Sequence, residues 1–189
     1  VYDLKMDKHG KPLKRKYRLC AKGFRQRQGV DYFNTYAPVI DPEIFRMCLA
    51  VAAELELEIE QFDFTAAFLT SDNDVEMYVE IPPGYHPKLK DKRVILKLKK
   101  SIYGMKQSAH LFYKNVSSDL AKLGFKKSKS SPCLFRKYYD GNVALLVIHV
   151  DDGAYFARHR EYIAEDMKKL KRKYKLDHEN VTSIVVYDT

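Results

Sequence analysis

Apolar residues recur at helical spacing in three stretches of the chain. The first stretch follows Asp41-Pro42-Glu43, where a capping aspartate precedes a proline suited to the first helical position, and it continues to about Leu57. The second covers residues 107–123 and is followed by Gly124, where a left-handed C-terminal cap is expected. The third is marked by apolar residues at steps of four, three and four, namely Ile163, Met167, Leu170 and Tyr174. The pattern predicts three amphipathic helices.

Short β-favouring runs lie between these helices. Residues 66–69 follow the first run as a turn or helical turn, and Asp140-Gly141-Asn142 and Asp151-Asp152-Gly153 join the last three runs, which predicts two consecutive hairpins. Helices inserted among short antiparallel strands predict an α+β fold with a sheet covered on one face. The predicted strands are 57–65, 78–81, 94–98, 133–139, 143–150 and 154–157.

Composition limits the class of protein. The 189 residues are 46% hydrophobic, enough for one core or two small subdomains, which excludes a disordered tail. No run of about eighteen apolar residues occurs, and the basic N-terminus lacks the apolar stretch of a signal peptide, so we expect a soluble, intracellular protein with no membrane partner. Cys20, Cys48 and Cys133 are odd in number and far apart, which predicts reduced packing residues.

Charge is strongly segregated along the chain. Residues 1–29 contain ten basic and two acidic residues, whereas residues 47–87 contain nine acidic residues and no Lys or Arg. Further basic blocks occupy 88–106 and 168–175, within a net charge of +9. Such runs are often solvated faces, but basic flanks around an acidic centre also suit a protein that grips phosphates while holding metal ions.

Three carboxylates are candidates for that metal chemistry. Asp151 and Asp152 stand at the end of the apolar run 143–150, although Asp-Gly is also a common hairpin turn. Asp63 lies between two phenylalanines on a predicted strand, where a buried carboxylate needs a partner. Three carboxylates converging from two strands would form an oxygen-rich site for Mg²⁺, completed by substrate phosphates.

Six motifs together resemble one family. In chain order they are Tyr17-Arg-Leu-Cys-Ala-Lys-Gly-Phe24, Tyr36-Ala-Pro-Val39, Gln61-Phe-Asp-Phe-Thr-Ala-Ala-Phe-Leu69, Pro82-Pro-Gly84, Ser101-Ile-Tyr-Gly-Met-Lys-Gln107 and His149-Val-Asp-Asp152. Their order and spacing resemble the reverse transcriptase of copia-type long-terminal-repeat retrotransposons over residues 12–176. The resemblance implies a right-hand polymerase, with fingers at about 1–56 and part of 75–100, and a palm at about 57–74 and 101–176. The palm would be an antiparallel sheet packed on helices, in a ferredoxin-like arrangement.

The resemblance also implies an activity and its cofactor. Asp63, Asp151 and Asp152 match the catalytic, metal-binding carboxylates, which would hold two Mg²⁺ ions, with Mn²⁺ as an alternative. The implied reaction is RNA-directed DNA synthesis, in which a nucleotidyl group passes from a dNTP to the 3′-hydroxyl of a primer on an RNA or DNA template. We expect a cytoplasmic location, in the virus-like particle of an intact element, or a nuclear one.

Substrate contacts are implied in the same way, and each has a structural alternative. Arg18 matches the arginine that contacts the triphosphate, with Lys14 or Lys16 assisting, although a surface ion pair would also explain it. Phe68 matches the aromatic that excludes a ribose 2′-hydroxyl, or it is simply core. Tyr103, Gly104 and Lys106 belong to the block that lines nucleotide and template, while Lys106 also reads as a solvated lysine at a helix start.

Several departures from the family pattern leave a second interpretation open. His149 stands where the family usually has tyrosine, and Ser108-Ala109-His110 where it has Ala-Pro-Arg. The thumb and ribonuclease H parts of a parent polyprotein have no room here, and the family's glycine-bearing strand is not recognisable at 177–180. The alternative is a catalytically inactive descendant that binds nucleic acid. A ferredoxin-like RNA-recognition sheet is a third, weaker interpretation.

Overall fold

The computed structural model describes residues 1–82 and 94–180. They divide into two compact units, which we treat separately: a first unit of 1–36 with 68–111, and a second of 37–67 with 112–189. The Pro82-Pro-Gly84 motif and the basic block at 88–106 fall partly outside the described residues.

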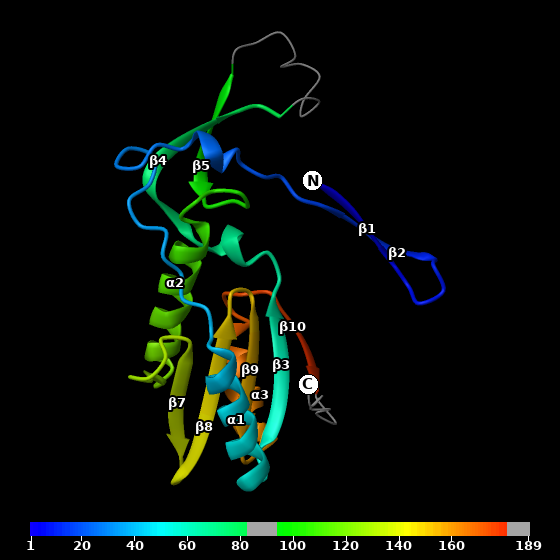
Figure 1. The fold of residues 1–189 in the computed structure, drawn as a ribbon, viewed down its shortest axis with the longest axis vertical. Coiled ribbons are helices and arrows are strands. Elements are labelled where there is room, and N and C mark those ends of the chain that lie inside the picture. Colours follow the sequence, from blue (N-terminus) through cyan, green and yellow to red (C-terminus); the bar gives the residue numbers. More distant parts are fainter. Residues whose placement is uncertain (83–93, 181–189) are drawn as a thin grey trace. The chain divides into compact units, whose positions relative to one another are not determined.

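The second unit contains an antiparallel six-stranded sheet in the order β10-β3-β9-β8-β7-β6 (Figure 1). The two predicted consecutive hairpins are confirmed as β7–β8 and β8–β9. Asp140 and Gly141 both have positive φ in the first of these turns, as a two-residue type I′ turn requires. The strands are β3 (Glu58–Phe64), β6 (Lys126–Lys127), β7 (Leu134–Tyr139), β8 (Asn142–His149), β9 (Asp152–Ala157) and β10 (Leu176–Asn180).

All three predicted helices are confirmed, as α1 (Pro42–Glu54), α2 (Ser108–Lys122) and α3 (Arg160–Leu170). The Asp41 carboxylate caps α1 by accepting a hydrogen bond from the Glu43 backbone N–H at 2.8 Å. Gly124 follows α2 with a φ of 91°, as expected of a left-handed cap. None of the described helices is long and apolar enough to cross a membrane.

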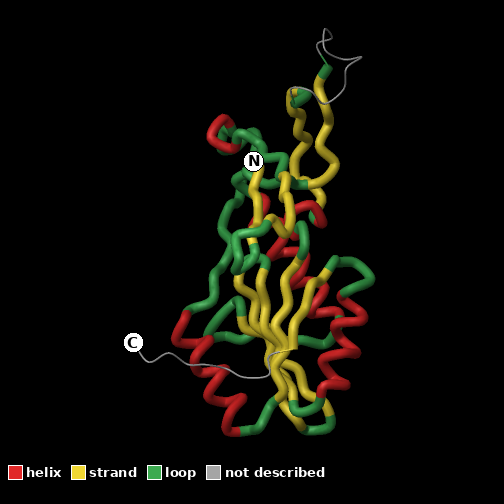
Figure 2. Tube along the Cα trace, turned by 90° about the vertical axis from the view of Figure 1, so that its right-hand side faces the viewer, coloured by secondary structure: helices red, strands yellow, loops and turns green. Residues whose placement is uncertain are grey.

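Helices cover both faces of this sheet, so the prediction of a single covered face was wrong (Figure 2). On one face, Phe45 of α1 packs edge-on against Phe156 of β9, in a core that includes Cys48 and Cys133. On the other face, Phe64 contacts Phe112 of α2 and Tyr174, which follows α3. The reason lies in the strands, because nearly every residue of β9 is buried instead of every second one.

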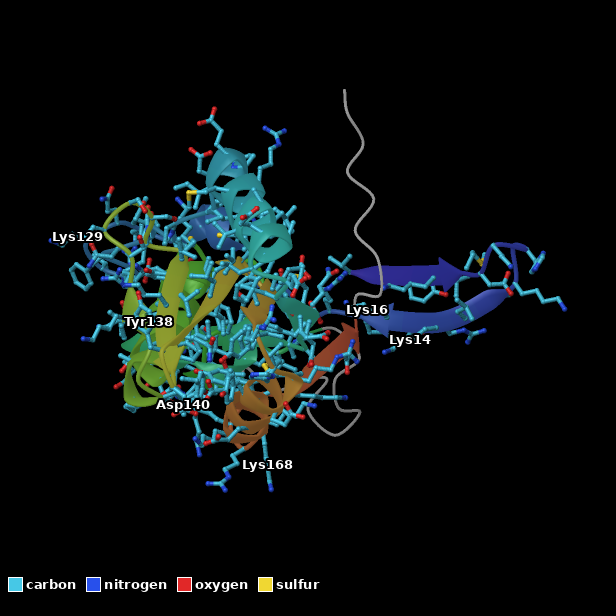
Figure 3. The ribbon with its side chains drawn as sticks, turned by 90° about the horizontal axis from the view of Figure 1, so that it is seen from below. Lys14, Lys16, Lys129, Tyr138, Asp140 and Lys168 are labelled. Carbon is cyan, nitrogen blue, oxygen red and sulfur yellow. The ribbon has the colours of Figure 1, made fainter. Side chains whose placement is uncertain are left out.

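The first unit is built from two hairpins and the loops around them. β1 (Tyr2–Met6) pairs with β2 (Pro12–Tyr17), and β4 (Asp72–Glu80) pairs with β5 (Ile95–Lys100). Lys14 and Lys16 project from β2 (Figure 3). The prediction placed the start of β4 too late, at residue 78, because the acidic residues at its start do not favour a strand in isolation.

The fully buried Gln107 joins the loops of the first unit. Its amide nitrogen donates to the Asp31 carbonyl at 3.0 Å, and its amide oxygen accepts from Gln26 at 2.9 Å. A buried amide with both ends satisfied fixes the segments that meet on it.

The fold confirms a mixed arrangement of helices and antiparallel strands, with a few changes of boundary. The third helix ends at Leu170, so Tyr174 lies in the turn after it. Arg18 lies one residue beyond β2, and its N–H donates to the Val1 carbonyl at 2.8 Å. Residues 177–180, where no family strand was recognisable, belong to the edge strand β10.

Candidate active site

Carboxylates from three neighbouring strands share one row across the sheet of the second unit. Asp63 on β3 is the direct register partner of Asp152 on β9 and of Asp177 on β10. His149 on β8 is in turn the partner of Asp152. Directly opposed residues on antiparallel strands point to the same face of a sheet. The register therefore puts Asp177, Asp63, Asp152 and His149 side by side on the face that α1 partly covers.

Asp151 lies in the two-residue loop between β8 and β9. Val150, the first loop residue, has a φ of 58°, whereas the φ of Asp151 is not positive. This combination is typical of a type II′ turn. A β-branched residue at positive φ is strained. The Asp151 carbonyl accepts from the Phe64 N–H at 2.7 Å, so the loop is tied to the end of β3 beside Asp63.

Gly153 does not make this turn, which corrects the Asp-Gly turn interpretation. Its φ is not in the left-handed region, and it is a register partner of Phe62. A Cβ at this position would lie 2.2 Å from the Phe62 ring, so glycine is needed for the ring to pack there. The turn geometry belongs to Val150 and Asp151, which leaves both aspartates at the end of the sheet.

The row concentrates negative charge. Asp63 and Asp151 are half-buried and Asp152 is exposed. Within the described part of the chain, neither Asp151 nor Asp152 forms an ion pair with a lysine or arginine. Like charges placed directly opposite on adjacent strands destabilise a sheet unless a cation or solvent offsets them. At Asp151 and Asp152, no lysine or arginine of the described residues supplies that cation.

No preformed cage is present at this row. Among the described residues, no group of three or more His, Cys, Asp or Glu side chains is spaced to hold a metal ion. Mg²⁺ does not require such a cage, because it keeps several waters and commonly binds one or two carboxylates together with substrate phosphates. Asp63 opposite Asp152, with Asp151 on the adjoining loop, fits that form of binding.

A cavity of about 580 Å³ adjoins the row in the second unit. It lies between α1 and the sheet, and its apolar wall includes Phe45, Leu49 and Phe156. Asp152 and His149 also line it. A volume of this size lies within the range of small-ligand sites, so one carboxylate of the row faces a ligand-sized space.

In the first unit, three predicted substrate residues come together from distant parts of the sequence. The Phe68 and Tyr103 rings meet edge-to-face with centroids 5.0 Å apart. The Arg18 guanidinium lies 5.9 Å from the centroid of the Tyr103 ring, within cation–π range. Tyr103 thus bridges the candidate phosphate-binding arginine and the candidate sugar-selecting phenylalanine.

Gly104 has a packing reason to be glycine. Its φ is 84°, and a Cβ would lie 2.3 Å from the Ala21 carbonyl oxygen. The neighbouring Tyr103 carbonyl accepts from the Ala21 N–H at 2.7 Å. The two loops pass too close for a side chain, whether or not Gly104 also contacts a substrate.

The predicted lysines lie elsewhere in the first unit. The Lys106 ammonium donates to the Tyr32 hydroxyl at 3.3 Å and lies 5.0 Å from the centroid of that ring. Its backbone N–H donates to Gln26 at 2.8 Å. Lys16 is half-buried on β2, where its register partner is Asp3.

Sequence reasoning missed Asp177. The Thr65 hydroxyl donates to the Asp177 carboxylate at 3.0 Å, which holds this side chain on the same face as Asp63. No local signal could have identified it, since its position depends on β10 pairing with β3. His110, one of the departures from the family pattern, places its Nδ1 2.7 Å from the Tyr36 carbonyl and so has a structural contact of its own.

Comparisons with known proteins agree with the resemblance. A family model described as reverse transcriptase (RNA-dependent DNA polymerase) matches residues 1–186. The chain is 34% identical over 175 residues to the retrovirus-related Pol polyprotein from transposon TNT 1-94 of Nicotiana tabacum, an alignment covering 92% of this chain and 13% of that protein. It is 30% identical over 182 residues to the corresponding polyprotein from transposon RE1 of Arabidopsis thaliana, covering 96% of this chain and 12% of that protein.

A yeast relative is also similar, over a shorter range. The transposon Ty1-BL Gag-Pol polyprotein of Saccharomyces cerevisiae is 31% identical over 127 residues, which is 67% of this chain and 7% of that protein. The chain therefore spans only a small part of each of these relatives. No solved structure matches the chain. From the family match and the plant relatives, the chain belongs to the reverse transcriptase (RNA-dependent DNA polymerase) family, in the form carried by copia-type retrotransposon Pol polyproteins.

Proposed function

We propose that this chain supplies the nucleotidyl-transfer part of an RNA-directed DNA polymerase. The reaction would transfer the nucleotidyl group of a dNTP to a primer 3′-hydroxyl on an RNA or DNA template, with release of pyrophosphate. The observation that carries this proposal is the register of Asp63 opposite Asp152, with Asp151 on the tied loop beside them. The second unit would be the palm and the hairpins of the first unit would belong to the fingers. The thumb and ribonuclease H would come from the remainder of a parent polyprotein.

The donor set at the row suits Mg²⁺. Asp63 and Asp152 would supply carboxylate oxygens from facing positions, and Asp151 a third from the loop. When bound, such ions would lower the pKa of the primer 3′-hydroxyl and neutralise charge on the triphosphate. The strained Val150 turn keeps both loop carboxylates at the end of the sheet.

The first unit would contribute recognition of the nucleotide. Arg18 can pair bidentately with phosphate oxygens while its guanidinium stacks near Tyr103. The edge-to-face contact with Tyr103 restrains the Phe68 ring, and a restrained ring can exclude a ribose 2′-hydroxyl by bulk. Lys16, Tyr103, Gly104 and Lys106 are proposed as further contacts with nucleotide or template.

The test is primer extension by the full chain, on RNA and DNA templates, with Mg²⁺ and with Mn²⁺. Extension on an RNA template that requires the divalent ion supports the proposal. Nucleic-acid binding without extension, even when a thumb from a relative is supplied, would contradict it.

Phe68 has its own test, in which selection and packing give opposite results. Phe68→Val should raise the ratio of ribonucleotide to deoxyribonucleotide incorporation while the melting temperature stays near that of the parent. A purely packing residue would instead lower the melting temperature on truncation and leave the ratio unchanged, because loss of a core phenylalanine costs about 3–5 kcal/mol.

A second candidate function is nucleic-acid binding without turnover. It is favoured by the departures from the family pattern at His149 and at Ser108-Ala109-His110. The same primer-extension experiment separates the two candidates, since only the first predicts product.

A further inference from the structure

A cluster of cations occupies the surface of the second unit around the C-terminal end of α3. Lys168, Lys171, Arg172 and Lys175 are all exposed. In the described part of the chain none of the four forms an ion pair. Figure 3 shows Lys168 extending from α3 away from the sheet. We call these four residues the α3 basic face.

Helical geometry places three of the four on one face. The Lys171 N–H donates to the Met167 carbonyl at 2.9 Å, and the Tyr174 N–H to the Leu170 carbonyl at 2.9 Å, so the helical turn continues past the end of α3 to Tyr174. Lys168, Lys171 and Arg172 follow the i, i+3, i+4 spacing of neighbours on a helix surface. Lys175 comes directly after this turn, where its carbonyl accepts from the Thr65 N–H at 2.9 Å. The buried stripe is separate and consists of Ile163, Met167, Leu170 and Tyr174.

Nearby carboxylates are already neutralised by other cations. Asp119 accepts from Lys173 at 2.5 Å and from Lys122 at 2.9 Å. Glu165 accepts from Lys169 at 2.5 Å, and the buried Asp166 from Lys137 at 2.8 Å. The α3 basic face therefore carries four charges for which the described residues supply no counter-ion.

The partner that fits this face is a phosphodiester backbone. Lysine and arginine in a row neutralise successive phosphates without reading sequence. An amphipathic membrane anchor would add exposed large apolar side chains, and among the described residues between 160 and 177 there are none. The face lies on the side of the sheet that carries α2 and α3, opposite the carboxylate row (Figure 2).

We propose that the α3 basic face is a second nucleic-acid-binding surface, separate from the carboxylate row and used without a divalent ion. It would hold a duplex or single strand by its phosphates, outside the reaction itself. Because the row and this face lie on opposite sides of one sheet, losing one should leave the other intact.

The experiment measures binding of the full chain to a fluorescein-labelled RNA–DNA duplex by anisotropy, in EDTA, over a range of salt concentrations. The test variant is K168E/K171E/R172E. The matched control is K114E/K126E/K129E, which makes the same charge change at exposed lysines of the same unit. Each lost phosphate contact lowers the slope of log affinity against log salt by about 0.9. We expect the test variant to lose about 2 to 3 units of slope and the control markedly less.

Three results would overturn the proposal. One is an equal loss of slope in test variant and control, which would mean a general charge effect. Another is an unchanged slope in a test variant whose melting temperature matches the parent. The last is binding to phosphatidylserine vesicles that depends on these residues while duplex binding does not, which would assign the face to membranes. The assay involves no metal and no turnover, so its outcome does not depend on primer extension.

Discussion

Carboxylates on opposite faces of the sheet in the second unit differ in burial and in whether a cation neutralises them. On the α2 and α3 side, Asp166 is completely buried, and it accepts from Lys137 at 2.8 and 3.0 Å, from Tyr155 at 2.8 Å and from Tyr139. On the α1 side, Asp152 is exposed and has no cationic partner in the described residues. Among the described residues, the charge of Asp166 is offset by a cation and that of Asp152 is not.

Two tyrosine hydroxyls, of Tyr139 and Tyr155, stabilise the Asp166 carboxylate as hydrogen-bond donors. Burial, together with the Asp166 charge, raises the pKa of Tyr155 and of Tyr139. Both hydroxyls therefore stay protonated and remain donors. The comparison separates a carboxylate whose charge is neutralised within the fold, Asp166, from one that the described residues leave without a cation, Asp152.

The largest expected effect is on activity at the exposed row. Asp152→Asn should lower primer extension about a thousandfold, which corresponds to about 4 kcal/mol of lost transition-state stabilisation. Its free energy of unfolding should stay within about 0.5 kcal/mol of the parent, or rise, since a like charge is removed. Gel-based extension and urea unfolding of the same preparation check both parts. A large loss of stability would place Asp152 with Asp166 as a structural carboxylate.

Asp166→Asn should show the reverse. Removing the carboxylate leaves Lys137, whose side chain is only 14% exposed, without its counter-ion. Breaking a buried pair in this way costs about 3–5 kcal/mol. Urea unfolding should detect the loss at neutral pH. An effect below about 1 kcal/mol would mean that water enters and solvates Lys137, and the contrast between the two faces would weaken.

The contribution of Asp119 to the free energy of unfolding should depend on pH. Burial opposes ionisation there, but hydrogen bonds from Lys173, Tyr174 and Lys122 outweigh it and lower the pKa of Asp119 to about 2. A depressed folded-state pKa stabilises the protein above the unfolded value of 3.8, and that stability is lost as pH falls towards 2. The side chain is 15% exposed, so we expect about 2 kcal/mol at neutral pH.

The measurement is the difference in unfolding free energy between parent and Asp119→Asn, followed from pH 7 downward. It should be constant to about pH 4 and shrink below that. A difference that does not change across this range would show that the lost contacts are not linked to ionisation.

The smallest effect is expected at Asp177. Removing one charge from the row by Asp177→Asn should stabilise the metal-free protein by about 0.2–1 kcal/mol, because opposed like charges on paired strands repel. Added Mg²⁺ should reduce that gain. Melting curves with and without the ion check the result, and Asp3→Asn on the other unit is the control. Destabilisation by Asp177→Asn would mean that its bond with Thr65 outweighs repulsion from Asp63.

Local chemistry in the sequence determined the helices and the hairpins. Asp41 and Pro42 start α1, Gly124 ends α2, and Asp140-Gly141 turns β7 into β8. Each signal acts between residues close in sequence, so it can be read without the fold. The six motifs likewise identified the family before any contact was known.

Only the tertiary structure decided which strands are neighbours. β3 lies between β9 and β10, which brings Asp63 opposite both Asp152 and Asp177, and nothing near residue 63 specifies that register. The Arg18–Tyr103–Phe68 contact joins residues from three separate segments in the same way. Burial of both faces of the sheet was also missed, because a strand covered on two sides loses the alternation that sequence patterns reveal. Pairing and burial depend on side chains distant along the chain, which local patterns do not contain.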